Sequence, residues 1–247
     1  MPTDSTSTAA VPMSSLARIG GVFTAPGRTF QSIAEAPHFY LCWTVEIVAA
    51  AGYFWFLVRH LGAYEVARQS MMQSSRAQAM DPATLQNAIN AAARFYHFMP
   101  LIVGFGVIIV TLVLAALFLG VANFLLGMEA KFKAVLAVVV HAMLPQALLA
   151  VLSALVLALM ADPTAFHYVN PLGSNLGFFL DKASTPAFLY AFATHLDVFA
   201  LWTVVLLGLG LACLSGRRGK FSSSFWAVFA LWMFYIILAS GAAAMFA

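Results

Sequence analysis

The fold is decided by residues 99–126, MPLIVGFGVIIVTLVLAALFLGVANFLL, a run that contains no charged side chain. A helix of about 20 residues crosses the hydrocarbon core of a bilayer, which is about 30 Å thick. This run is longer than that, and a soluble protein would have to bury it on every side. The stretch therefore predicts a transmembrane helix.

The rest of the chain shares this apolar character. Of its 247 residues, 63% are hydrophobic and 9% are charged, against about 25% charged in soluble domains. The net charge of +3 indicates anionic membrane lipids as partners and no nucleic acid. We therefore predict an all-α fold, a polytopic membrane helical bundle (38–247) with spans near 39–58, 99–126, 134–160, 188–213 and 224–247.

Two segments precede the first span. Residues 1–10 are rich in Ser and Thr and are predicted to be disordered. Residues 11–37 carry apolar side chains at helical spacing, interrupted near Pro26, which predicts two amphipathic helices in the cytoplasmic headgroup layer. Packing of these helices on the bundle is the alternative. In the interfacial arrangement, the residues that contact lipid are Arg18, Phe23, Arg28 and Phe30.

The polar segment 59–98 separates the first two spans and is predicted to form an external helical hairpin. Within it, Asp81 and Pro82 provide an N-cap followed by proline at the first helical position. A later loop, 170–180, begins with turn residues and ends in an apolar stretch that is predicted to enter the interface as a short helix.

Basic residues near the span ends predict the orientation. Seven lie in short segments on one side: Arg18, Arg28, Lys131, Lys133, Arg217, Arg218 and Lys220. Five are spread over longer segments on the other side: Arg59, Arg68, Arg76, Arg94 and Lys182. The density places the N-terminus in the cytoplasm and the C-terminus outside.

Ionisable residues inside the spans are the main functional candidates, because a charge at the centre of a membrane helix costs roughly 2.5–3.5 kcal/mol on insertion scales. At ~1.5 Å of rise per residue, Glu46 and His141 lie roughly 10 Å from the cytoplasmic ends of their spans, and Asp197 lies near the midplane. We therefore predict an intramembrane polar cluster: Glu46, His141, Asp197, His195, Asn123 and Gln146.

Proline at position 145 is predicted to kink the third span, because it lacks the N–H that would bond the carbonyl of His141. The polar cluster has three interpretations. Its members hydrogen-bond one another and fix helix register, or they form a proton or ion pathway, or Glu46, His141 and Asp197 bind a metal. Metal-binding patterns such as His-x-x-x-His are absent from the sequence. No cofactor is expected and no enzyme is predicted.

Several motifs together resemble the Yip family, the Ypt/Rab-interacting five-span membrane proteins, in its prokaryotic branch. The resemblance covers about residues 15–245. Its motifs are Phe23-x-x-Pro26-x-x-x-Phe30-x-x-Ile33, the hinge from Gly127 to Lys133, His141-Ala-Met-Leu-Pro145, and Leu196-Asp197-x-Phe199-x-Leu201-Trp202.

The resemblance implies a non-enzymatic membrane protein. Eukaryotic members act in vesicle traffic, bind Rab-type GTPases and associate with one another; the short N-terminal region here departs from their long cytosolic segment. An Ala-rich chain without glycosylation sequons is typical of the bacterial inner membrane. We therefore expect a membrane-organising or trafficking-type scaffold that binds lipid, with homo-oligomers and cytoplasmic protein partners. The alternative is a small transporter or channel for protons, other ions or metal ions.

Overall fold

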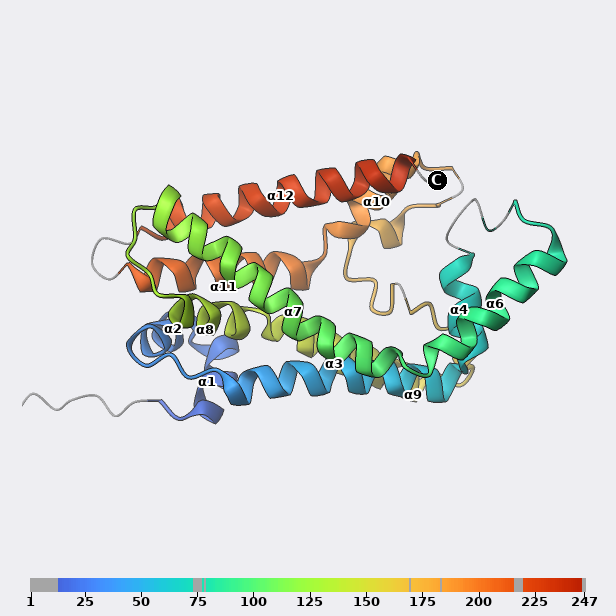
Figure 1. Ribbon diagram of the computed structural model, residues 1–247, viewed down its shortest axis with the longest axis horizontal. Helices are drawn as coiled ribbons and strands as arrows, with labels where there is room; N and C mark the ends of the chain where they lie inside the picture. Colours follow the sequence, from blue (N-terminus) through green and yellow to red (C-terminus); the bar gives the residue numbers. More distant parts are fainter. Residues whose placement is uncertain are drawn as a thin grey trace, which may run out of the picture.

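The computed structural model shows a bundle of helices, which confirms the predicted all-α fold (Figure 1). It describes residues 13–72, 77, 79–168, 170–182, 184–215 and 220–245. The segment predicted to be disordered, 1–10, lies outside these residues, as do Arg76, Arg217 and Arg218. The elements are α1 (Ser15–Thr24), α2 (Pro26–Glu35), α3 (Tyr40–Leu61), α4 (Ala63–Met71), α6 (Pro82–Tyr96), α7 (Met99–Gly120), η1 (Val121–Leu125), α8 (Phe132–Ala142), α9 (Leu144–Leu159), η2 (Pro163–Ala165), η3 (Leu176–Phe179), α10 (Ala187–His195), α11 (Val198–Leu214) and α12 (Phe221–Met245).

In the part of the chain that the structure describes, four helical segments are long and apolar enough to cross a membrane: Tyr40–Leu61, Met99–Leu125, Phe132–Leu159 and Phe221–Met245. They correspond to four of the five predicted spans. The fourth predicted span, 188–213, is not one continuous helix. It is divided into α10 and α11, and α11 is an apolar helix too short to meet the same length criterion.

The bundle is built around α8, whose residues from Val135 to Ala142 are all buried. Helix α3 packs against α7 and α9, and α12 packs along α10 and α11. Figure 1 shows α1 and α2 at one end of the bundle and the α4–α6 hairpin at the opposite end. The helices α3, α7 and α12 bury few residues, so that most of their apolar surface faces outward, as expected for contact with lipid.

The α1–α2 pair is docked on the bundle instead of lying free in the headgroup layer. Val22, Phe30 and Ile33 are fully buried and belong to the main core, and α2 packs on α8 and α11. The prediction that Arg18 and Phe30 contact lipid is therefore wrong, because Arg18 is only 2% exposed and Phe30 is fully buried. Phe23 is half-buried and packs edge-to-face on Trp202, whereas Arg28 is exposed.

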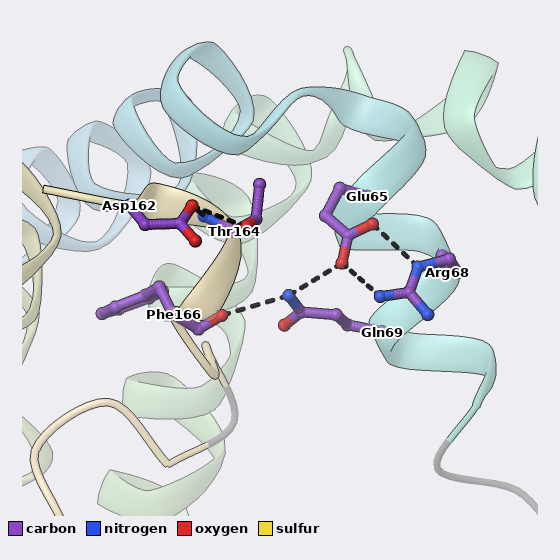
Figure 2. A network of polar contacts seen from close by, with 6 residues as sticks. All are labelled: Glu65, Arg68, Gln69, Asp162, Thr164 and Phe166. Atoms are coloured by element: carbon purple, nitrogen blue, oxygen red, sulfur yellow. Dashed lines mark hydrogen bonds and ion pairs between the residues drawn. The ribbon is translucent and has the colours of Figure 1, made fainter. Parts of the chain in front are cut away.

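The segment predicted as an external hairpin forms α4 and α6, which pack on each other. Figure 2 shows how α4 is tied to the loop before η3: the Gln69 amide donates to Glu65 Oε1 and to the Phe166 carbonyl, both at 3.1 Å. Arg68 forms an ion pair with Glu65 at 2.7 Å. Phe166 is buried against Leu57 at the end of α3. The hairpin is therefore fixed to the end of the bundle opposite α1 and α2.

Candidate functional site

The candidate site is the carboxyl group of Glu46, in the first third of α3. Glu46 is 5% exposed, and neither of its carboxyl oxygens has a hydrogen-bond partner among the described residues. It lines a pocket of about 190 Å³ between α3, α7 and α9. An unpaired polar group in such an environment is costly. The pocket lining also includes Ala50, Gly106, Val110, Thr111, Gln146 and Ala147.

The Glu46 carboxyl lies at the level of the middle of the third span. Gln146, which lines the same pocket, is halfway along the span Phe132–Leu159, about 20 Å from either end at ~1.5 Å per residue. Near the start of α3, the Cys42 thiol donates to the carbonyl of Val140, well inside that span. The start of α3 therefore lies beside the interior of α8 and not beside its first residues.

Two polar side chains line the pocket with Glu46, and both have partners elsewhere. The Thr111 hydroxyl donates to its own helix backbone and accepts from the Trp43 indole N–H at 2.9 Å. The Gln146 amide donates to the Thr203 hydroxyl at 3.3 Å. Threonine hydroxyls and amides in spans commonly join helices in this way. Neither group forms a hydrogen bond with the Glu46 carboxyl.

Proline 145 positions the α9 side of the pocket. The α-helix stops at Ala142 and resumes at Leu144, with Met143 in a turn between α8 and α9. The Met143 N–H donates to the carbonyl of Val139 at 3.0 Å, and the Gln146 N–H donates to the carbonyl of Met143 at 2.8 Å. The interruption turns Met143 and Gln146 toward α3, where both line the Glu46 pocket.

The structure does not pair Glu46 with His141. The His141 ring is buried, and its Nδ1 bonds the carbonyl of Ala137 in the same helix at 2.8 Å. His141 therefore belongs to the packing of α8, and its imidazole satisfies a hydrogen bond within its own helix.

Asp197 has a structural role as the N-cap of α11. Its carboxylate accepts from the N–H of Phe199 at 2.8 Å and of Ala200 at 3.2 Å. The hydroxyl of Ser174 donates to the other carboxylate oxygen. A carboxylate at a helix N-terminus is stabilised by the free N–H groups and by the helix dipole. Asp197 is thus not a mid-helix charge but the residue that starts the second half of a broken span.

The loop before α10 provides hydrogen-bond partners for the backbone groups that are left free where the span is divided into α10 and α11. Val198 N–H donates to the Ser174 carbonyl at 3.0 Å, and Leu176 N–H donates to the Leu196 carbonyl at 3.3 Å. Non-helical backbone at membrane depth persists only where protein satisfies it. Glycine at 177 is needed here, because a β-carbon would lie 3.0 Å from the backbone of Thr194.

The remaining predicted residues are also apart from the pocket. His195 lies edge-on to the ring of Tyr235, with centroids 5.8 Å apart. Asn123 bonds both the N–H and the carbonyl of Ala130, which closes the turn after η1. Of the six residues predicted as one cluster, only Glu46 and Gln146 line the same pocket. The described residues contain no group of three or more His, Cys, Asp or Glu side chains arranged to hold a metal.

Sequence reasoning missed three polar residues that matter here: Thr111, Thr203 and Ser174. The two threonines lie inside apolar runs, and an isolated hydroxyl in a span is the signal that could have identified them. Ser174 lies in a loop, and nothing in the sequence indicates that it reaches Asp197.

A family model described as the Yip1 domain matches residues 20–242, nearly the whole chain. The chain belongs to the Yip1 domain family. The match confirms the family resemblance, and with the long apolar helices it makes the chain a multi-pass integral membrane protein. No curated protein and no solved structure matches the chain.

Proposed function

We propose that this Yip1-domain protein organises membranes as a non-enzymatic scaffold that contacts lipid, with its α1–α2 pair in the cytoplasmic leaflet of a bacterial inner membrane. The observation that carries the proposal is the fixed docking of this pair at one end of the bundle. A rigid amphipathic unit in one leaflet enlarges the protein's cross-section there. Such an asymmetric inclusion favours curvature of the bilayer.

The pair is held in one conformation by Arg18. Its guanidinium donates to the carbonyl of Ala36 at 2.7 Å and to the carbonyl of Ser32 at 3.0 Å. These carbonyls belong to the C-terminal turn of α2, where free acceptors and the helix dipole favour a cation. Burial lowers the pKa of Arg18, but an arginine remains charged under physiological conditions. The buried charge therefore fixes α1 against α2.

The outward face of the pair is suited to the membrane surface. Leu16 is 73% exposed and Arg28 is also exposed, a combination of apolar and basic side chains that favours an anionic interface. Helices α8 and α12 begin near the end of the bundle that carries α1 and α2 (Figure 1), and the residues just before them are Lys131 and, in the case of α12, Lys220. This concentration of basic residues supports a cytoplasmic orientation for that end.

The test uses the full chain reconstituted into vesicles of zwitterionic and anionic phospholipids, with vesicle diameter measured by cryo-electron microscopy. We expect wild-type protein to reduce the mean diameter in proportion to its amount, and Leu16→Glu to abolish the effect. Gln31→Glu is the matched control, because it adds the same charge at an exposed position of α2. Vesicles that are unchanged by wild-type protein, or equally changed by Leu16→Glu, would contradict the proposal.

The alternative function, a transporter or channel, has less support. It depended on Glu46, His141 and Asp197 acting as one polar pathway. His141 bonds its own helix, and Asp197 caps α11, so these two groups are engaged elsewhere. Of these three residues, only Glu46 has no hydrogen-bond partner among the described residues.

A further inference from the structure

The Glu46 pocket opens toward the lipid-facing side of α7. Val110, on the lining of the pocket, is 50% exposed. One turn before it, a β-carbon added at Gly106 would meet no atom within 4 Å. The missing side chain at Gly106 therefore leaves an opening between α3 and α7. Because the pocket lies halfway along the third span, this opening faces acyl chains.

The chemistry of the pocket favours a neutral carboxyl. The groups that face Glu46 from α7 and α9 are the Thr111 hydroxyl and the Gln146 amide, neither of which is charged. From α3 itself, the nearest titratable group is the Cys42 thiol, one helical turn earlier. His141, two residues before Met143, is bonded to Ala137. With no cation among these neighbours, an ionised carboxylate would lie uncompensated in a medium of low dielectric constant.

We propose that Glu46 is a proton-binding site, held neutral inside the bundle and reached from the lipid phase through the opening at Gly106. Its occupant is a proton, and the carboxylic acid exchanges it with lipid-soluble acids and bases. Aqueous metal ions and other hydrophilic reagents do not reach it. This inference is independent of the membrane-organising function, because it concerns the α3–α7–α9 side of the bundle and not the α1–α2 pair.

Such a site has a distinctive reactivity toward carbodiimides. A neutral carboxylic acid adds its O–H across one C=N bond of the reagent, and the acyl group then migrates to nitrogen to give a stable acylurea. Nothing leaves, so the modified residue gains the whole mass of the reagent. A lipid-soluble carbodiimide reaches acids that face acyl chains, whereas a water-soluble one reaches acids that face water.

The experiment treats the full chain in phospholipid vesicles with dicyclohexylcarbodiimide and locates the adduct by peptide mass spectrometry. We expect modification at Glu46 and none at this position in Glu46→Gln. Gly106→Leu should slow the modification roughly tenfold or more, because a side chain in the opening leaves no space for the reagent. Gly120→Leu is the matched control, since Gly120 is also in α7 with free space around it but does not line the pocket.

A parallel reaction with a water-soluble carbodiimide and an amine should modify the exposed Glu35 and leave Glu46 unchanged. Circular dichroism of each variant verifies that the fold is kept. The proposal is overturned if Glu46 of the wild type does not react, or if Gly106→Leu reacts at the wild-type rate. It is also overturned if the water-soluble reagent modifies Glu46, or if sodium or potassium salts protect it, because either result would make the pocket an aqueous ion site.

Discussion

Asp197 and Glu46 are both carboxylic acids inside apolar stretches of the same bundle, and their surroundings differ at every point. Asp197 accepts hydrogen bonds from two backbone N–H groups and from Ser174, in a region where loop and helix are closely packed. Glu46 has no partner among the described residues and lies beside a pocket. The comparison teaches that the role of a carboxyl group in a span follows from its hydrogen-bond partners and not from its depth in the membrane.

The largest expected change in the free energy of unfolding follows from loss of the α11 cap. We expect Asp197→Ala to lower the free energy of unfolding by about 3 kcal/mol, because it removes a helix cap and leaves the part-buried N–H groups of Phe199 and Ala200 without a partner. Denaturation of the purified protein in mixed detergent micelles measures this value. Asp162→Ala is the control, since Asp162 caps the exposed η2 and its loss should have a much smaller effect. Equal losses in the two variants would contradict the structural role of Asp197.

The next largest effects on stability come from two glycines, Gly177 near Asp197 and Gly106 near Glu46, which report how closely each region is packed. We expect Gly177→Ala to destabilise the protein by about 2 kcal/mol, because the new methyl group would overlap the backbone of Thr194. Gly106→Ala, in open space, should be neutral or raise stability by up to about 1 kcal/mol through helix propensity. The same denaturation experiment measures both. A destabilising Gly106→Ala would mean that the opening beside Glu46 is filled.

Replacement of the Glu46 carboxyl should not lower the free energy of unfolding, in contrast to replacement of Asp197. We expect Glu46→Met to leave the free energy of unfolding unchanged or to raise it by about 1 kcal/mol, because it removes a buried polar group that has no partner. Gln146→Met provides the contrast: it breaks the bond to Thr203 and should destabilise by about 1 kcal/mol. If Glu46→Met proved the more destabilising of the two, Glu46 would have a partner.

The smallest effect belongs to the exposed ion pair of the external hairpin. The hydrogen bond from Arg68 lowers the pKa of Glu65, so its stabilisation is present above the ordinary glutamate pKa of about 4.3. It is lost as the pH falls through the lowered value. We expect Glu65→Gln to cost less than about 0.5 kcal/mol at neutral pH, because solvent screens surface pairs. The difference in unfolding between wild type and variant should vanish in acid; a difference that grew there would contradict the assignment.

The sequence was sufficient for the parts of the fold that depend on hydrophobicity. Runs of apolar residues such as 99–126 identify spans because a bilayer tolerates little else. The burial of Arg18 was not predictable in the same way, because an arginine opposite apolar residues has the same pattern whether its partner is a lipid phosphate or the end of α2. Only the three-dimensional structure brings Ala36 and Ser32 to its guanidinium.

The candidate site was predictable only in part, for a related reason. Glu46 and Gln146 were identified as polar residues in spans, and they line one pocket. Asp197 was assigned to mid-helix because residues 188–213 form one apolar run, although an aspartate before Val198 is also a helix-start signal. The deciding partner, Ser174, is 23 positions away in a loop. Hydropathy carries no information on such a contact.

Isotope-edited infrared spectroscopy of the two carboxyl groups tests the central claim most directly, with Glu46→Gln and Asp197→Asn as the difference references. Glu46 should contribute the carbonyl band of a neutral acid without a strong hydrogen bond, and Asp197 should contribute the bands of a hydrogen-bonded carboxylate. Carboxylate bands from Glu46, or a neutral-acid band from Asp197, would contradict the account.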